Sequence, residues 1–301
     1  MPLLVTGSIA IDTVRTPFGV SENCLGGSAI YFSMAASFFA PVRLVAVVGP
    51  DCPFDLAATF AGKDVDLKGV EVRTGSKTFR WAGSYHGPMS EAITDKAELN
   101  VLAERPPQVP DGYKDSRYVF LANTAPALQQ ELLKQIDKPA FVAADTMNCW
   151  IRDHLDDLKR LLQKVDALVL NNGEARQLTG EDNLTKAAER ILQMGPAVVI
   201  IKKGEHGSLM CGKDGVSFSL PGFPTGQVKD PTGAGDSFAG ALMGYLAEQD
   251  RTDIEALKTA IAYGTVAASF TVEGFSTQRL TSITRAVIDK RFETLRKLTQ
   301  F

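Results

Sequence analysis

The most informative segment of this 301-residue chain reads KDPTGAGDSF, from Lys229 to Phe238. Apolar residues recur behind it at helical spacing as far as Leu246, so the glycine-rich turn is predicted to open a buried helix. Gly233 and Gly235 carry no side chains, which lets the backbone approach another group closely. The free amide groups of such a turn and the positive end of the helix dipole favour a bound anion. A transferred phosphoryl group needs donors of this kind.

Asp236 stands at the start of the predicted helix, beside this anion site. A carboxylate in that position repels an anion, and the repulsion makes sense if Asp236 must take a proton from an attacking hydroxyl. Asp236 is therefore predicted to be the general base of a phosphoryl transfer. The alternative is that its carboxylate only caps the helix.

Other motifs for phosphate binding and hydrolysis do not fit the chain. It contains no G-x-x-x-x-G-K-[ST] segment, and G-x-G-x-x-G would need a glycine at position 238, where Phe238 stands. Ser237 could suggest a serine hydrolase, but no histidine follows His206 and no G-x-S-x-G segment is present. The sequence thus excludes the P-loop class and argues against a serine hydrolase.

The rest of the chain alternates short apolar runs with helical patterns. The runs that predict strands are Leu3–Thr6, Arg43–Val48, Val119–Ala122, Ala140–Ala144, Ala167–Leu170 and Ala197–Ile201. Apolar stripes at helical spacing begin at Leu155 and at Leu184. Strands that are apolar throughout and are separated by amphipathic helices indicate an α/β fold, with a doubly wound, mostly parallel central sheet and helices on both faces.

Polar residues follow several of these strands at the point where each one ends. They are Asn123, Asp145, Asn171 and Lys202. Ligands of open parallel sheets bind beyond the carboxyl ends of the strands, so these side chains are predicted to line one cleft. Asn123 is expected to contact the substrate there.

Two irregular segments break the alternation, at about residues 13–25 and 72–104. The second contains TFRWAGSY at residues 78–85, which is typical of an exposed strand with aromatic side chains. Both are predicted to leave the main sheet and pair into a small β-sheet lid, inserted in a single domain of residues 1–301. Ordinary surface loops are the alternative, although loops of this length in a compact domain are usually functional or disordered.

Composition narrows the classes of partner. Apolar residues make up 45% and charged residues 22% of the chain, and the formal net charge is -3 without a basic stripe, which argues against nucleic acid as the main partner. The start, MPLLVTGSIAID, lacks the regions of a signal peptide, and no apolar stretch is long enough to cross a bilayer. Four scattered cysteines predict reduced thiols, and three histidines are too few for a histidine-rich metal site. A soluble, cytoplasmic enzyme acting on a small molecule is expected.

Together, these motifs resemble those of the ribokinase-like (phosphofructokinase B) family of carbohydrate and nucleoside kinases. The segment DPTGAGDSFAGALM, residues 230–243, fits the family's C-terminal signature throughout. Other pieces fall in the family's order, and the match covers nearly the whole chain. They are GSIAID at 7–12, the Gly26-Gly27 pair, VGPD at 48–51, NNGE at 171–174 and GEHG at 204–207.

The resemblance implies a kinase that transfers the γ-phosphoryl group of ATP, with Mg²⁺, to a hydroxyl of a sugar or a sugar-like substrate. Asp236 would be the catalytic base. The backbone of Gly233, Ala234 and Gly235 would form the anion hole for the transferred group.

The resemblance also implies a nucleotide site and two kinds of metal site. The residues expected at the nucleotide are Asn171, Glu174, Lys202, Gly204, Gly207, Ala267 and Gly274. Glu174 would hold Mg²⁺ through water, unless it is only a solvated glutamate at a helix start, and Lys202 could be a surface lysine. Asp230 and Thr232 match positions that bind a monovalent cation such as K⁺ in some members.

On the acceptor side, Asp12 would bind substrate hydroxyls, and Gly26 and Gly27 would approach the substrate closely. Asp12 could instead be an ordinary turn residue. The two irregular segments match the family's lid, which often pairs between subunits, so a homodimer is expected.

Two departures from the family bear on the acceptor. Many sugar kinases of the family carry asparagines where this chain has Tyr31 and Ala10, and their loss argues against ribokinase itself. Tyr31 could stack on a sugar or a base, and so could the lid aromatics Phe79, Trp81 and Tyr85. A nucleoside kinase is therefore the main alternative to a sugar kinase, and a non-catalytic binding protein of the same fold is a further one. The sequence does not name the acceptor.

Overall fold

A computed structural model describes residues 1–87, 89 and 92–300. Its main feature is one large sheet. In spatial order, the strands of this sheet are β13 (Ser217–Leu220), β12 (Ser208–Gly212), β11 (Val198–Lys202), β10 (Ala167–Asn171), β9 (Phe141–Asp145), β8 (Tyr118–Leu121), β1 (Leu3–Thr6), β4 (Val42–Val48) and β5 (Val65–Val72). The strands from β11 to β5 run parallel, and β12 and β13 are antiparallel. This arrangement confirms the predicted mostly parallel sheet.

Each of the six strands predicted from apolar runs is present, with bounds shifted by no more than one residue. The two edge strands, β5 and β13, and β12 next to β13 were not predicted. Edge strands bury less of their surface, and the alternating exposure of β13 (SFSL) leaves no continuous apolar run. Apolar runs therefore identified the interior of the sheet and failed at its edges.

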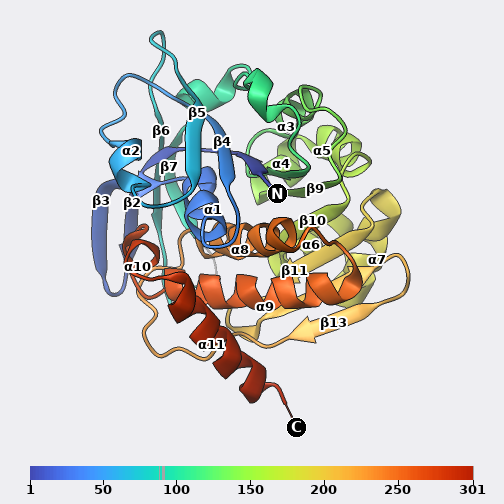
Figure 1. Ribbon diagram of the computed structural model, residues 1–301. Coiled ribbons are helices and arrows are strands. Elements are labelled where there is room, and N and C mark those ends of the chain that lie inside the picture. The colour runs from blue at the N-terminus through green and yellow to red at the C-terminus, as the bar shows by residue number, and fades with distance from the viewer. Residues whose placement is uncertain (88, 90–91, 301) are drawn as a thin grey trace.

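Helices cover both faces of the sheet, as predicted (Figure 1). One face packs against α1 (Ser28–Ala36), α8 (Ala234–Gln249), α9 (Ile254–Thr271), α10 (Gln278–Thr281) and α11 (Arg285–Leu298). The other packs against α3 (Pro126–Leu133), α4 (Asn148–Asp153), α5 (Leu155–Leu162), α6 (Asn172–Thr179) and α7 (Leu184–Met194). The short α2 (Leu56–Thr59) follows β4, and 3-10 turns lie at Asn100–Ala103, Asp111–Tyr113 and Gly204–His206.

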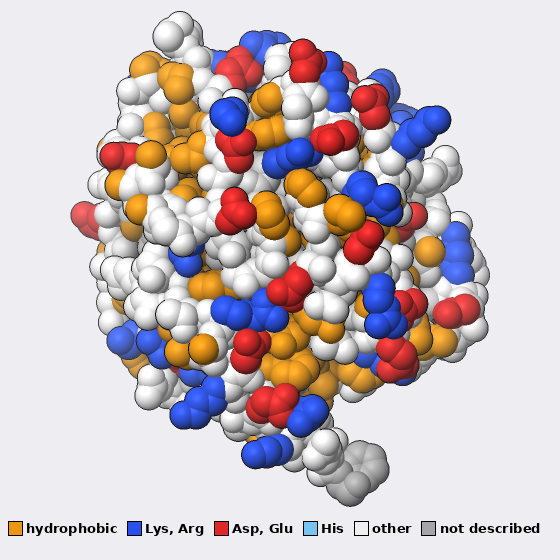
Figure 2. Space-filling view, in the orientation of Figure 1, with side chains coloured by type: hydrophobic (Ala, Val, Ile, Leu, Met, Phe, Trp, Pro, Cys, Tyr) orange, Lys and Arg blue, Asp and Glu red, His pale blue; other side chains and the backbone are white. Residues whose placement is uncertain are grey.

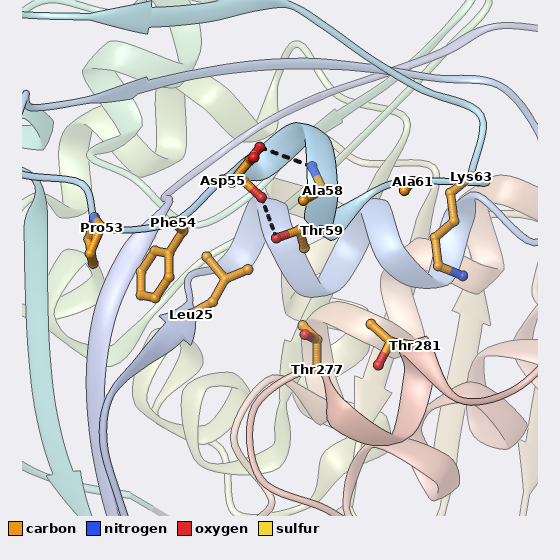
Figure 3. Close-up of a pocket in the computed structure, with 10 residues that line it drawn as sticks. All are labelled: Leu25, Pro53, Phe54, Asp55, Ala58, Thr59, Ala61, Lys63, Thr277 and Thr281. Carbon is orange, nitrogen blue, oxygen red and sulfur yellow. Dashed lines mark hydrogen bonds between the residues drawn. The ribbon is translucent and has the colours of Figure 1, made fainter.

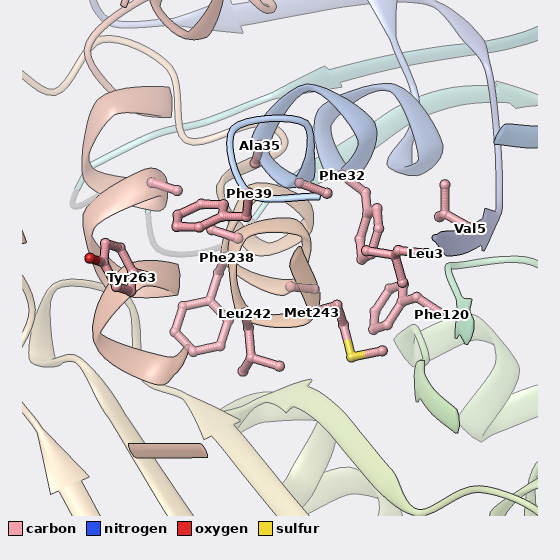
Figure 4. Packing of buried hydrophobic residues seen from close by; sticks show 14 of the residues in the cluster. Leu3, Val5, Phe32, Ala35, Phe39, Phe120, Phe238, Leu242, Met243 and Tyr263 are labelled. Atoms are coloured by element: carbon pink, nitrogen blue, oxygen red, sulfur yellow. The ribbon is translucent and has the colours of Figure 1, made fainter. Parts of the chain in front are cut away.

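The packing of α1 against α8 fixes the place of the glycine-rich turn. A Cβ atom on Gly240 would lie 2.3 Å from the backbone oxygen of Phe32, so the glycine permits close approach of the two helices. Phe32 stacks on Phe120 of β8 with ring centroids 4.6 Å apart, which ties α1 to the sheet (Figure 4). Contacts with α1 in the hydrophobic core thereby fix the position of the amino-terminal end of α8.

A second, smaller sheet has the strand order β3 (Gly19–Gly26), β2 (Ala10–Thr16), β6 (Phe79–Ser84) and β7 (Ile93–Glu98), and we call it the lid sheet. It lies at the left of Figure 1. Only the pair of β2 and β6 is parallel. Phe18 and Val20 at its tip are 61% and 55% exposed. That this sheet closes as a lid or pairs between subunits stays a prediction, and residues 88, 90 and 91 of the predicted lid segment lie outside the described residues.

The surface view shows lysine and arginine side chains interspersed with aspartate and glutamate (Figure 2). This face has no continuous basic area of the kind that binds nucleic acid. In the described ranges, no helix combines the length and the apolar character needed to span a membrane.

Candidate active site at the carboxyl edge of the sheet

The glycine-rich turn begins α8 in the predicted manner. Gly233 is the N-cap residue, with a left-handed φ of 75°. A Cβ atom there would lie 2.3 Å from Cγ of Tyr31, whose ring fills the space behind the turn. Within the described residues, the amides of Gly233 and Gly235 donate to no protein acceptor. The amide of Ala234 donates to the oxygen of Pro231 at 3.1 Å, so the anion hole predicted over three residues narrows to two amides in this structure.

Asp236 lies in the first turn of α8 and is half-buried as a residue. The helix has no side-chain cap hydrogen bond, and the cap alternative therefore has no support. Desolvation raises the pKa of Asp236, and the positive charge of Lys202 opposes this shift. A carboxylate with a raised pKa is a stronger base, as proton abstraction requires.

Lys202 places a positive charge beside the turn. It ends β11, next to Asn171 at the end of β10. A Cβ atom on Gly235 would lie 2.6 Å from Nζ of Lys202. The ammonium group thus lies beside Gly235, and Lys202 is half-buried; its role toward a nucleotide stays a prediction.

Asn171 and Glu174 form a capping box at the start of α6. The Glu174 amide donates to Oδ1 of Asn171 at 2.8 Å, and the Asn171 amide donates to Oε2 of Glu174 at 2.7 Å. Glu174 is buried rather than solvated. The capping box explains the position of both side chains, and their role toward Mg²⁺ and ATP stays a prediction.

Asp145 was predicted to line the cleft, but no chemical role was assigned to it from the sequence. It is 6% exposed, and its Oδ1 atom has no hydrogen-bond partner within the described residues. Its pKa is raised well above the usual value by desolvation and then by the charge of Asp236, while Lys202 lowers it. The available signal was its position at a strand end, on the same sheet edge as Asn171.

Asp12, predicted to bind the acceptor, lies on β2 of the lid sheet and is 3% exposed. A Cβ atom on Gly26 would lie 1.8 Å from Oδ2 of Asp12, so only glycine fits there. Gly27 has a φ of 98°, in the left-handed region that favours glycine. Burial, followed by the charges of Asp230 and Asp236, raises the pKa of Asp12 to about 8, against the opposing effect of the Gly27 amide.

The Asp12 pKa predicts a pH dependence of stability. Since the folded pKa of about 8 exceeds the unfolded value of 3.8, the folded protein holds a proton that the unfolded chain has lost. This contribution is complete below about pH 4 and is lost as the pH rises to about 8. Asp12→Asn removes it, so the variant should gain stability relative to the wild type as the pH rises. The gain should reach at most about 6 kcal/mol, because the two pKa values differ by about 4 units and each unit is worth about 1.4 kcal/mol.

Thermal unfolding of both proteins at a series of pH values between 5 and 9, each about one unit apart, measures this difference. If the difference in stability between wild type and Asp12→Asn stayed constant over the whole pH range, the pKa assigned to Asp12 would be contradicted. The expected result is that the variant becomes more stable than the wild type by an amount that grows as the pH rises.

The predicted cation positions lie beneath the turn. Asp230 is 0% exposed, and its Oδ1 accepts the Thr232 amide at 2.9 Å while Oδ2 has no partner within the described residues. Burial raises the pKa of Asp230. The Tyr85 hydroxyl of the lid lies 3.3 Å from Oγ1 of Thr232. The lid sheet therefore touches the turn, and the orphaned carboxylate oxygen fits either a cation or a proton.

Two residues expected at the acceptor are placed differently. Tyr31 is 1% exposed, with its ring packed under Gly233, so it presents no face on which a substrate could stack. Asn123 is engaged by the protein, because its Oδ1 accepts Nε1–H of Trp150 at 2.7 Å and its amide lies 3.4 Å from the Met147 sulfur. Its expected direct contact with substrate stays a prediction.

The residues expected at the nucleotide lie on several elements. Gly204 and Gly207 form the turn between β11 and β12, directly after Lys202, and both have a positive φ. Gly274 follows α9. Ala267 is 0% exposed within the core, so its side chain cannot contact a nucleotide, whereas the neighbouring Ala268 is only partly buried.

A hollow of about 580 Å³ lies between α2, the end of β3 and α10 (Figure 3). Leu25, Thr277 and Thr281 line it, together with several residues between Pro53 and Lys63. Asp236 and the glycine-rich turn are not among its lining residues. This hollow therefore lies outside the candidate active site.

Comparisons with known proteins agree with this geometry. The family model for pfkB family carbohydrate kinases matches residues 25–284. A cytidine kinase from Thermococcus kodakarensis is 29% identical over 253 residues, which is 81% of this chain and 88% of that protein.

Solved structures show the same fold. A Burkholderia thailandensis nucleoside kinase in complex with inosine superposes with a TM-score of 0.76 at 20% identity, over 97% of this chain and 96% of that one. The aminoimidazole riboside kinase from Salmonella enterica, complexed with aminoimidazole riboside and an ATP analogue, gives a TM-score of 0.77 at 17% identity, over 97% and 100%. At these identities, the likeness shows the fold alone.

Proposed function

The chain belongs to the pfkB family of carbohydrate kinases, and we propose that it transfers the γ-phosphoryl group of ATP to a ribose hydroxyl of a nucleoside. The observation that carries the proposal is the meeting of three groups at the start of α8. They are the open amide of Gly235, the ammonium group of Lys202 and the carboxylate of Asp236, which is a half-buried residue. The amide and the ammonium group, which can stabilise negative charge, thus lie beside a carboxylate that can accept a proton.

These groups support an in-line transfer. The acceptor hydroxyl gives its proton to Asp236 as its oxygen forms a bond to the γ-phosphorus, and the bond from that phosphorus to the β-phosphate oxygen breaks. The Gly233 and Gly235 amides and Lys202 stabilise the charge on the transferred group. ADP then leaves together with the phosphorylated acceptor.

Two metal ions are part of the proposal. Mg²⁺ would neutralise phosphate charge, and proteins usually hold it through one or two carboxylates together with substrate phosphates and water. Asp145, with its unpaired oxygen, and Glu174 fit that donor chemistry. The orphaned oxygen of Asp230 fits a monovalent cation such as K⁺ beneath the turn.

The choice of a nucleoside over a simple sugar rests on two observations. The cytidine kinase similar to this protein aligns with most of the chain. The position where many sugar kinases of the family carry an asparagine holds Tyr31, which is buried. A site that lacks donors for sugar hydroxyls gains less from a bare sugar. A sugar kinase with the same catalytic groups remains the second candidate.

A panel of acceptors tests the proposal. We expect ADP release with ATP and Mg²⁺ to depend on an added nucleoside, with cytidine and inosine giving at least about tenfold higher kcat/KM than free ribose. A coupled ADP assay measures these rates. Activity confined to free sugars would replace the nucleoside assignment by a sugar kinase, and ADP release with no acceptor dependence would reject both.

A further inference from the structure

The two faces of the lid sheet differ in character. Strand β2 pairs in parallel with β6, and Asp12 is directly opposite Trp81. Directly opposite residues of neighbouring strands point to the same face, and neighbouring strands lie about 4.8 Å apart. Trp81 therefore shares the face of Asp12, which is the face that reaches the glycine-rich turn through Tyr85. The opposite face carries the ion pair of Arg15 with Asp95.

The indole of Trp81 is held in one orientation on that face. Gly83 lies beneath it, since a Cβ atom there would lie 2.2 Å from Cζ2 of Trp81. The indole N–H donates to Oγ1 of Thr94 on β7 at 3.2 Å. The hydrogen bond to Thr94 thus fixes the edge of the ring, and the ring occupies space that a side chain at position 83 would fill.

Core packing does not explain this side chain. Trp81 is only partly buried, and it belongs to neither hydrophobic core of the described residues nor to the side chains packed against them. Thr94 beside it is exposed. A fixed, partly exposed aromatic ring on the same sheet face as the Asp12 carboxylate is suited to stack on a planar group.

We propose that Trp81 is the stacking surface for the base of the nucleoside whose ribose hydroxyls Asp12 binds, an inference that rests on the proposed function. Asp12 and Trp81 stand on adjacent strands, a separation that suits a ribose and its attached base. Tyr31, the other aromatic considered for this role, is buried under the turn. The base therefore rests on the lid sheet rather than on the main domain.

Kinetic comparison of Trp81→Ala and Trp81→Phe tests this inference. Base stacking on an aromatic side chain corresponds to a loss of about 10- to 100-fold on truncation to alanine. We expect Trp81→Ala to lower kcat/KM for cytidine and inosine by that factor, mainly through KM, and to change kcat/KM for ribose by less than about twofold. Trp81→Phe keeps a ring and should retain most of the nucleoside activity.

Fluorescence supplies a readout that does not depend on turnover. The chain has two tryptophans, so the emission left in Trp81→Phe comes from Trp150. We expect cytidine to quench the wild-type emission and ribose not to, and we expect Trp81→Phe to lose the quenching. Circular dichroism checks that each variant is folded, and Trp81→Phe keeps the test valid if Trp81→Ala does not fold.

The outcomes that count against the inference are distinguishable. If the wild type phosphorylates nucleosides and Trp81→Ala does so equally well, the stacking inference is rejected and the proposed function stands. Equal losses for nucleosides and ribose, or a change of oligomeric state without a change in selectivity, would show that Trp81 only supports the lid or a second copy. Wild-type activity on sugars alone would overturn the nucleoside assignment and this inference together.

Discussion

Replacing Asp236 with asparagine is expected to lower kcat by about a thousandfold, within the range of about 10² to 10⁴ that general bases contribute. Asparagine keeps the shape of the side chain but cannot take the proton of the acceptor hydroxyl. Because the substitution removes a negative charge from beside the anion site, ATP should bind at least as well as it does to the wild type. Steady-state kinetics together with equilibrium binding of a non-hydrolysable ATP analogue would separate the two effects.

A matched control uses another aspartate at the start of a helix. Asp55 caps α2 by accepting the Ala58 amide at 3.0 Å, and asparagine caps equally well. Asp55→Asn should therefore leave kcat unchanged. If Asp236→Asn also kept a near-normal kcat, Asp236 would not be the base, and Asp145 would be the next carboxylate to test.

Replacing Gly233 with alanine should lower kcat by about a hundredfold, the cost of moving a reacting group by about 1 Å. The new methyl group would lie 2.3 Å from the ring of Tyr31, and Tyr31 is only 1% exposed and packed in the core. The turn must shift instead, and its amides leave the phosphoryl group. The left-handed φ of 75° adds a strain of about 1 to 2 kcal/mol.

Gly180 provides a control in which alanine strains the backbone but overlaps no neighbouring atom. Its φ is 73°, and nothing lies within 4 Å of a Cβ atom placed there. Gly180→Ala should lower the free energy of unfolding by about 1 to 2 kcal/mol, as the strain at Gly233 does, and should leave kcat unchanged. Equal kcat values for the two variants would mean that the position of the turn does not matter for transfer. Thermal unfolding and steady-state kinetics of both variants give the comparison.

The interior of the fold was predictable because its physical signals are local. Strands such as β8 and β10 are buried on both sides and read as continuous apolar runs, and the apolar stripe that begins at Phe238 is enough to predict α8. The edge strand β5 carries charged residues between apolar ones and escaped notice. Local sequence patterns thus predicted the strands and helices that are buried in the core.

The site was predictable only in part, since its geometry depends on contacts between distant segments. The sequence pointed to Asp236, Lys202 and the two glycines of the turn, but it contained no sign that the Tyr31 ring fills the space behind Gly233. The unpaired oxygen of Asp145 is likewise a property of the folded chain. Such contacts join residues far apart in sequence, and no periodicity records them.

The lid sheet illustrates the same limit. TFRWAGSY indicated an exposed aromatic strand. β6 confirms the strand, but its residues are half-buried or buried rather than exposed. The pairing that sets Trp81 opposite Asp12 joins segments 69 residues apart, which no pattern in either segment records. Whether the lid sheet moves depends on interactions with substrate that neither segment encodes.

Transfer of a labelled γ-phosphoryl group from ATP tests the central claim most directly. The protein would be incubated with labelled ATP, Mg²⁺ and cytidine or inosine, and the products separated and identified by mass spectrometry. We predict that the label appears on the ribose of the nucleoside in the wild type and disappears from that product in Asp236→Asn. Label found only in inorganic phosphate, or transferred equally well by both proteins, would contradict the proposed transfer.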